Sequence, residues 1–194
     1  MKTVYSFILF AFLSTGVFAQ TTWTADKAHS QLSFGITHLG ISEVEGLFDK
    51  FDATIVASEE DFSDAEVEVV VDVNSINTGV EMRDNHLRSA DFFDVENHGK
   101  MTFSSDSIVQ TGENKYQLFG DLTLHGITKP VTLDMWYRGT LKQEKGPVSG
   151  FQVTGTIKRS DFNVGNGFPE AALSDEVRIK FDGEFKPKKE TVKE

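Results

Sequence analysis

Few side chains in this 194-residue chain could perform covalent chemistry. The sequence has no cysteine and no Gly-x-Ser-x-Gly segment, so it offers neither a thiol nucleophile nor a hydrolase nucleophile elbow. No two of the five histidines stand four residues apart, which is the spacing of a helical zinc site. Glu43 and Glu45 share a strand face, but without a partner acid elsewhere they indicate a solvated face. We therefore expect no catalytic residues and no metal site.

Arg83 is the most informative polar residue. It falls on the same helical face as Leu87, in a chain that has few cations to offer an anion. Two interpretations stay open for its guanidinium. It contacts an anionic group of a ligand, or it forms an ion pair with Asp84, Asp91 or Asp161.

Three further polar residues carry a similar ambiguity. His38 lies on the same strand face as Phe34, and it is either a structural histidine or a ligand contact. His86 comes one helical turn after the arginine and could add a hydrogen-bond donor. Arg159 either pairs with Asp161, two residues away, or meets a ligand.

One segment has a helical rather than an alternating pattern. Thr78 and Glu81 have the spacing of a capping box, with Thr78 as the N-cap. This spacing predicts a short helix over residues 79–90. Phe92 and Phe93 follow directly and could cover a ligand near the end of that helix.

Elsewhere the dominant signal is period-two alternation, which is typical of strands with one buried face. Weaker runs at 44–57, 100–110 and 147–160 bring the count to about eight strands, with turns at 112–114, 126–128 and 145–147. Consecutive strands of this kind favour an antiparallel meander. The apolar positions predicted to share the inner face are Leu32, Phe34, Ile36, Ala65, Val67, Val69, Val71, Val73, Tyr116, Leu118, Leu122, Leu124, Val131, Leu133, Met135, Tyr137, Val177, Ile179, Phe181 and Phe185.

Eight strands can close into a barrel, and the charged face decides its orientation. The outer positions carry Glu66, Glu68, Arg178 and Lys180. A charge facing lipid at mid-depth costs roughly 2–4 kcal/mol, so the polar face is expected in water and the apolar face inside. A barrel of this size is either filled by its own side chains or holds one small ligand, and periodicity leaves both open.

The amino-terminal stretch predicts export. Residues 1–19 combine a positive start, an apolar run and a Val17-Phe18-Ala19 cleavage site, which is typical of a signal peptide. We therefore expect a periplasmic or secreted protein with no membrane segment after cleavage, a barrel domain over 20–186 and a charged flexible tail at 187–194. The formal net charge of −11 excludes the basic footprint of a nucleic-acid-binding protein.

Four segments resemble the YceI-like family of bacterial periplasmic polyisoprenoid-binding proteins. They are residues 29–48, 75–95, 120–131 and 159–162, with the sequences HSQLSF and HLGISEVEGLF, SINTG and RDNHLRSADFFDV, GDLTLHGITKPV, and RSDF. Two turn positions depart from the family pattern, with Asn163 in place of glycine and Gly99 in place of proline. The resemblance implies an eight-stranded antiparallel lipocalin-like barrel, all-β apart from one short helix near its mouth.

The resemblance also implies a function, which is to bind and to carry or store a long-chain isoprenoid, a quinone tail or a fatty-amide type of amphiphile inside the barrel. Two alternatives stay open, a lipid-modifying enzyme and a ligand-free stress or interaction protein with a packed core. We expect no cofactor and no nucleic-acid partner, and the oligomeric state is left open, a homodimer included. The expected ligand-binding residues are Phe34, Ile36, His38, Phe48, Met82, Arg83, His86, Leu87, Phe92, Phe93, Leu118, Leu133 and Met135.

Overall fold

The computed structural model describes residues 20–188. The predicted signal peptide at 1–19 and residues 189–194 of the predicted tail lie outside this range. β10 extends to Pro187, one residue past the predicted end of the barrel domain at 186, and the Lys188 N–H donates to Thr22 O over 2.7 Å. The strands are β1 (Thr21–His38), β2 (Ser42–Phe48), β3 (Phe51–Ala57), β4 (Glu66–Asp72), β5 (Ile76–Asn77), β6 (Lys100–Gly112), β7 (Lys115–Leu124), β8 (Ile127–Leu141), β9 (Val148–Lys158) and β10 (Leu173–Pro187).

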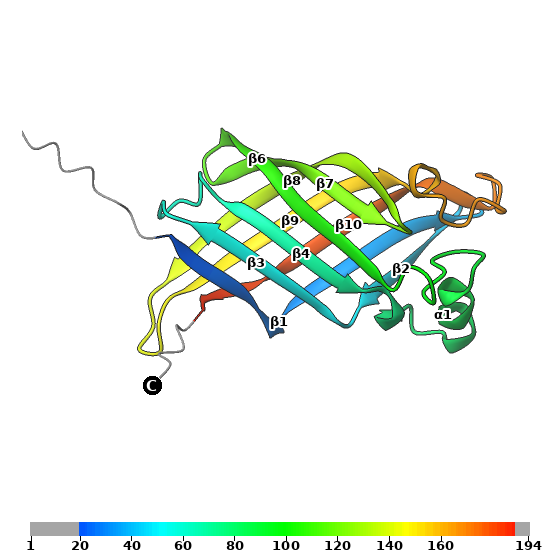
Figure 1. Cartoon of the computed structure of the whole chain (residues 1–194), viewed down its shortest axis with the longest axis horizontal. Coiled ribbons are helices and arrows are strands. Elements are labelled where there is room, and N and C mark those ends of the chain that lie inside the picture. The colour runs from blue at the N-terminus through cyan, green and yellow to red at the C-terminus, as the bar shows by residue number, and fades with distance from the viewer. Residues whose placement is uncertain (1–19, 189–194) are drawn as a thin grey trace, which may run out of the picture.

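The strands form one closed antiparallel barrel (Figure 1). The sheet order is β10-β9-β8-β7-β6-β4-β3-β1-β2-β5, and pairing of β1 with β10 closes it. β2 and β3 pair with successive halves of β1, and β5 continues the line of β4 beside β2. β2 and β3 together occupy one position in the barrel, and so do β4 and β5. The barrel therefore has eight strand positions, as predicted.

The inner and outer faces of the strands are those predicted from the alternation. Val67, Val71, Leu118 and Met135 are buried inside the barrel, and the other predicted inner positions are buried or half-buried. The outer residues Glu66, Glu68, Arg178 and Lys180 of β4 and β10 are exposed. Burial of the apolar face therefore fixes the register of each strand, because a slip by one residue would reverse both faces.

Two of the three predicted turns have the expected position, between β6 and β7 and between β8 and β9. The turn predicted at 126–128 lies one residue earlier, because Ile127 already begins β8. It consists of His125 and Gly126, both in the left-handed region with φ of 50° and 72°. Two left-handed residues match the twist of an antiparallel hairpin.

The helix α1 (Glu81–Arg88) is shorter than the predicted range of 79–90. The capping box was wrong, because Val80 is the N-cap and makes no side-chain cap bond. The Thr78 hydroxyl instead donates to Asp84 Oδ1 over 2.5 Å. Among residues 20–188, no helix is long and apolar enough to cross a bilayer. Two short 3-10 helices, η1 (Val73–Ser75) and η2 (Arg159–Phe162), complete the elements.

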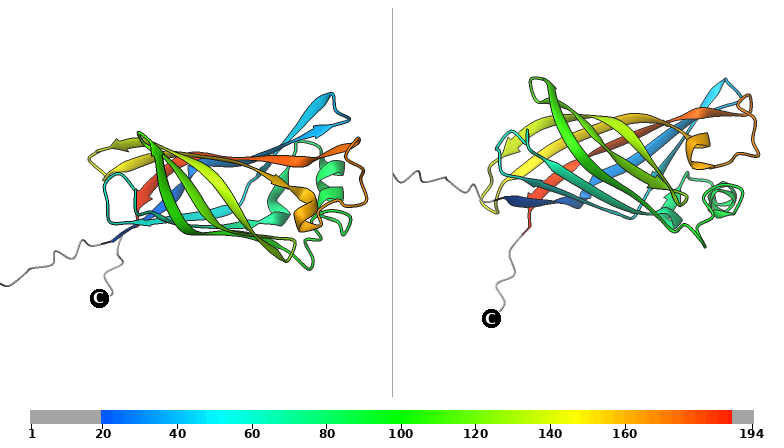
Figure 2. Two further views of the ribbon diagram at one scale, coloured as in Figure 1. Left: turned by 90° about the horizontal axis from the view of Figure 1, so that it is seen from above. Right: turned by 45° about the horizontal axis from the view of Figure 1, so that its top comes forward.

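An aromatic cluster fills the end of the barrel opposite α1. Phe62, on the loop between β3 and β4, is 2% exposed and lies 5.3 Å from Trp23, 5.0 Å from Tyr137 and 4.9 Å from Phe151, measured between ring centroids. The Tyr116 hydroxyl donates to Asp61 O over 2.7 Å and so holds this loop in place. We call this cluster the aromatic plug. Figure 2 shows the loop at one end of the barrel and α1 at the other.

Candidate functional site

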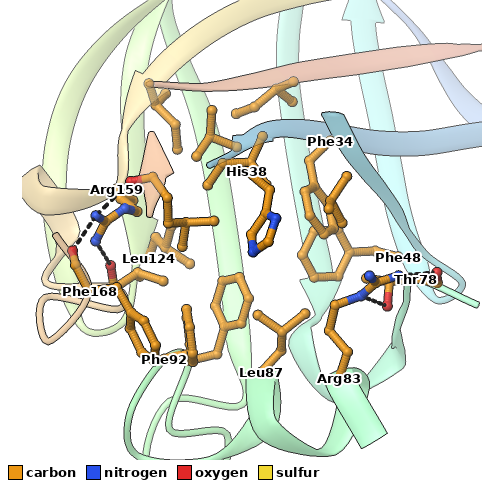
Figure 3. A pocket seen from close by; sticks show the side chains of 18 of the residues that line it. Phe34, His38, Phe48, Thr78, Arg83, Leu87, Phe92, Leu124, Arg159 and Phe168 are labelled. Carbon is orange, nitrogen blue, oxygen red and sulfur yellow. Dashed lines mark hydrogen bonds between the residues drawn. The ribbon is translucent and has the colours of Figure 1, made fainter. Parts of the chain in front are cut away.

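The larger cavity lies inside the barrel at the α1 end and has a volume of about 350 Å³. Its wall is mostly apolar and comes from β1, β2, β10, α1 and the segments that follow α1 and η2. Nine of the predicted residues line it, and Figure 3 shows several of their side chains facing one space. They are Phe34, Ile36, His38, Phe48, Arg83, His86, Leu87, Phe92 and Phe93.

A smaller cavity of about 90 Å³ lies deeper in the barrel. The other three predicted inner residues, Leu118, Leu133 and Met135, line it. The two cavities share Leu32, Met101 and Ile179 as wall residues, so these side chains form the constriction between them. Phe151 and Phe185, which pack together beside Phe62, lie at the deep end. The order along the barrel is therefore mouth, larger cavity, constriction, smaller cavity and plug.

Met82 was predicted to line the cavity and does not. Its side chain is 81% exposed and contributes to neither cavity. The inward face of α1 carries Arg83, His86 and Leu87, which are three and four residues apart and therefore lie on one side of the helix. Met82 precedes this face by one residue and projects to the outside.

Arg83 lies at one side of the mouth, and its guanidinium is held by a threonine rather than by an acid (Figure 3). Its Nε donates to Thr78 Oγ1 over 2.7 Å, and its NH2 group donates to Thr78 O over 2.8 Å. Neither Asp84, Asp91 nor Asp161 forms an ion pair with it within the described residues. Asp84 accepts from Thr78, so Thr78 links the carboxylate to the guanidinium. Two of the five N–H donors are used, and the others remain available at the cavity wall.

Arg159 lies at the opposite side of the mouth and is 6% exposed. The predicted pair with Asp161 is absent from the described part of the chain. All five guanidinium N–H groups instead reach backbone carbonyls at 2.6–3.2 Å. The acceptors are the carbonyl oxygens of Val164, Gly165, Phe168, Leu173 and Ser174. Arg159 therefore fixes the loop from η2 to β10, which forms one wall of the mouth.

The charge of Arg159 also acts on the carboxylate of Asp175, with which it forms no ion pair within the described residues. Burial opposes ionisation of Asp175, but its hydrogen bonds from the Ser160 N–H and hydroxyl and the nearby Arg159 outweigh burial. The pKa of Asp175 therefore lies below its usual value. At the mouth, Arg159 therefore uses all five of its N–H donors, whereas Arg83 uses two of its five within the described residues.

The two histidines of the mouth differ in their surroundings. The His38 ring projects into the opening (Figure 3) and has no hydrogen-bond partner within residues 20–188. The His86 ring lies 3.2 Å from Asp91 Oδ2 and packs edge-on against Phe92 and Phe168, with centroids 5.1 and 5.9 Å away. His86 is therefore anchored by neighbours, whereas His38 is not.

Part of the wall was missed in the sequence. Val164 and Phe168 line the cavity from the loop that Arg159 holds, and Leu173 lines it from the first position of β10. The loop has no hydrophobic period. Asn163, where the resemblance implied a glycine, adopts a left-handed conformation with φ of 57°. Asparagine enters this region at small cost.

These features define the class of protein. A closed antiparallel barrel of eight strands, with an apolar interior cavity and a helix at its mouth, is a lipocalin-like fold. The chain belongs to the YceI-like domain family, whose model matches residues 23–185.

Relatives and solved structures agree with this assignment. The UPF0312 protein SA2479 of Staphylococcus aureus is 40% identical over 167 residues, which are 85% of this chain and 94% of the relative. Burkholderia cenocepacia BcnA superposes with a TM-score of 0.76 at 29% identity, over 83% of this chain and 98% of that one. The Campylobacter jejuni YceI protein gives 0.72 at 32% identity, over 80% and 91%. A polyisoprenoid-binding domain from Saccharophagus degradans, 18% identical, shares the fold with a TM-score of 0.64 over 87% of this chain and 99% of that domain.

Proposed function

We propose that this protein binds one long-chain isoprenoid or a similar amphiphilic lipid in the barrel and carries or stores it. The observation that supports this most directly is the apolar cavity of about 350 Å³, which lies within the size range of small-molecule sites. In the proposed complex the tail fills the larger cavity and points toward the plug. The head group stays at the mouth, beside Arg83 and His38.

The wall of the cavity supports an apolar occupant. It is mostly apolar, and water is a poor filler where the wall offers few polar partners. An apolar tail in the cavity would remove both its own surface and the wall from water. A hollow of about 350 Å³ inside the barrel also disfavours the packed-core alternative for this chain.

Burial of the tail supplies the affinity without a specific polar contact. Each methylene gives about 0.8 kcal/mol, so a tail of about 20 carbons gives roughly 16 kcal/mol before association costs. Those costs take back several kcal/mol, which leaves micromolar to nanomolar binding. The same arithmetic holds for isoprenyl diphosphates, quinones and fatty amides. One structural neighbour, from Saccharophagus degradans, is described as a polyisoprenoid-binding domain, which is consistent with this ligand class.

A matched pair of tryptophan substitutions tests the proposal. Val177 on β10 lines the larger cavity, and Val70 on β4 faces outward and is 39% exposed. Val177→Trp adds a ring to the cavity, and Val70→Trp adds the same atoms to the outer surface. We expect Val177→Trp to weaken binding of a C20 isoprenoid at least tenfold while the protein still folds, and Val70→Trp to leave binding unchanged.

The measurement is native mass spectrometry with a titration of the C20 alcohol, with thermal melts of both variants. Equal affinity of Val177→Trp and wild type would contradict the proposal. So would a wild-type protein that binds no lipid and loses 1–3 kcal/mol when Val177 is enlarged, because that cost is typical of an overpacked solid core. Turnover of the lipid by the wild-type protein would favour the enzyme alternative.

A further inference from the structure

Three side chains with metal-binding atoms meet outside the cavity wall. One carboxylate oxygen of Asp94 and one ring nitrogen each of His98 and His125 all lie within 4.8 Å of one another, and all three residues are half-buried. The two imidazole rings have centroids 4.6 Å apart and are inclined by 64°. Asp94 and His98 come from the segment after α1, and His125 comes from the turn between β7 and β8.

His125 is oriented by a second group, as metal-binding histidines usually are. Its Nδ1 lies 3.1 Å from Phe162 O in η2. A carbonyl oxygen can only accept, so in the neutral imidazole Nδ1 carries the proton and Nε2 keeps a free lone pair. A histidine that donates one N–H to a carbonyl and offers its other nitrogen is the usual arrangement of a zinc ligand.

The other two residues are also held in position. The Asn97 amide donates to both carboxylate oxygens of Asp94, at 3.1 and 2.9 Å. The backbone N–H of His98 donates to the backbone carbonyl of Asp94 over 2.8 Å. This bond closes one turn, which brings both side chains to the same side. The His98 ring lies against Gly126, where a Cβ atom would come within 2.7 Å of its Cε1. Within residues 20–188, neither ring nitrogen of His98 has a hydrogen-bond partner.

We propose that Asp94, His98 and His125 bind a divalent transition-metal ion of the zinc type. Two imidazoles and one carboxylate are a ligand set that zinc accepts, at about 2.0–2.2 Å per bond. Ligand atoms around a tetrahedral ion lie about 3.3 Å apart, and the three atoms lie within 4.8 Å of one another, so each pair needs to close by at most about 1.5 Å. Small rotations of the side chains suffice for a movement of this size. A fourth position stays open for water.

The ion would join two segments that are distant in sequence. Phe93 and Leu124, the neighbours of Asp94 and His125, line the larger cavity, and Phe162 O supports His125 from η2. A metal ion at this point would cross-link the segment after α1 to the β7–β8 turn behind the cavity wall, and the hydrogen bond between His125 and Phe162 would connect η2 to them. The proposed role is therefore to stiffen one side of the mouth.

A second cluster in the same molecule serves as a control. Asp26, His29 and Glu184 also each place one possible ligand atom within 4.8 Å of the other two. There, however, the Lys186 ammonium forms an ion pair with Asp26 and so already supplies the positive charge that a metal ion would bring. We therefore expect no metal binding at this second cluster.

The test is a titration of the purified, untagged full chain with Zn²⁺ alone, by calorimetry and by competition with a chromophoric chelator. We expect one ion per chain, and a melting temperature that rises with Zn²⁺ but not with Ca²⁺, which prefers oxygen ligands. His98→Ala should weaken binding at least tenfold, and so should His125→Asn, in which asparagine retains a left-handed conformation and an N–H donor. His29→Ala should bind like wild type. Co²⁺ should give the visible absorption of a tetrahedral site in wild type and in His29→Ala only.

Unchanged zinc affinity in His98→Ala and Asp94→Asn would overturn the proposal, and so would a loss of affinity in His29→Ala. If thermal melts show that His125→Asn fails to fold, the Asp94 and His98 variants decide the outcome. Lipid binding is not part of this readout, so the result stands whether or not the lipid proposal holds.

Discussion

Replacing Arg83 by methionine separates a head-group contact from a purely structural arginine. Methionine keeps an apolar stem of similar reach and removes the charge. In the structure two guanidinium N–H groups are bound to Thr78, and the remaining donors lie at the cavity wall. The variant therefore loses any bond that those donors make to an anionic head group.

The expected size of the effect follows from that count. One charge-assisted hydrogen bond contributes about 1.5–3 kcal/mol, which is roughly a ten- to hundredfold change in Kd. We expect this loss for a C20 isoprenyl diphosphate and no loss for the C20 alcohol with the same tail. Loss of the two bonds to Thr78 should also lower the free energy of unfolding by about 1–3 kcal/mol.

Arg88→Met is the matched control, because it removes the same charge from the same helix. Arg88 donates to Asn74 O, Ile76 O and the Asn85 side chain and does not line the cavity. The measurement is the Kd of each lipid for wild type and both variants, obtained by titration. Thermal melts of the three proteins control for folding. If Arg83→Met weakens the diphosphate and the alcohol equally, or if Arg88→Met gives the same pattern, Arg83 does not read the head group.

Two further predictions concern stability. Arg159→Met leaves five carbonyl groups without their shared donor, so we expect the free energy of unfolding to fall by about 3–5 kcal/mol in urea titrations; a change below 1 kcal/mol would contradict the role of Arg159 in holding the loop. The Lys186 ammonium and then His29, both bound to Asp26, hold the pKa of that carboxyl well below its usual range, so its stabilisation is present above the unfolded pKa of about 3.9 and is lost as pH falls toward the folded value. Asp26→Asn should therefore be less stable than wild type at pH 7 and lose less of its stability between pH 5 and pH 2. If the free energy of unfolding falls by the same amount in both proteins between pH 5 and pH 2, the ionised Asp26 does not stabilise the fold.

The strands were predictable because alternation is a direct consequence of the pleat. Buried positions such as Val67, Leu118 and Met135 alternate with polar residues. The charged face had to lie in water, because every other environment costs more free energy. Eight strands and a meander order then left closure as the way to protect the edges. Whether the interior is filled or hollow depends on how side-chain volumes sum in three dimensions, and periodicity does not contain that information.

The helix start was mispredicted because one side chain had competing partners. Thr78 has the residue type and spacing of an N-cap, but its hydroxyl is used by Asp84 and Arg83 instead. Met82 is exposed for another reason, since one residue turns a helix by about 100° and Met82 therefore lies off the face that carries Arg83. A local signature cannot reveal which of several nearby partners a hydroxyl will choose.

The environment of Arg159 could not be predicted from its neighbours in sequence. Asp161 is two residues away, yet the guanidinium points inward to carbonyls up to 15 residues further along. Backbone acceptors leave no trace in residue types. The loop wall with Phe168 was missed for the same reason, since an irregular segment is placed by the groups that bind it and not by a period.

The aromatic plug has a consequence for how a guest would come and go. Phe62 adopts a left-handed φ of 62°, an unusual conformation for a bulky residue, and burial among Trp23, Tyr137 and Phe151 holds it there. With this end blocked, a lipid bound as proposed could not pass through the barrel. It would enter tail first and leave head first through the mouth, so every buried carbon would pass the mouth twice. The residence time would then depend on the length of the tail, and the plug would set the greatest length that the barrel can hold.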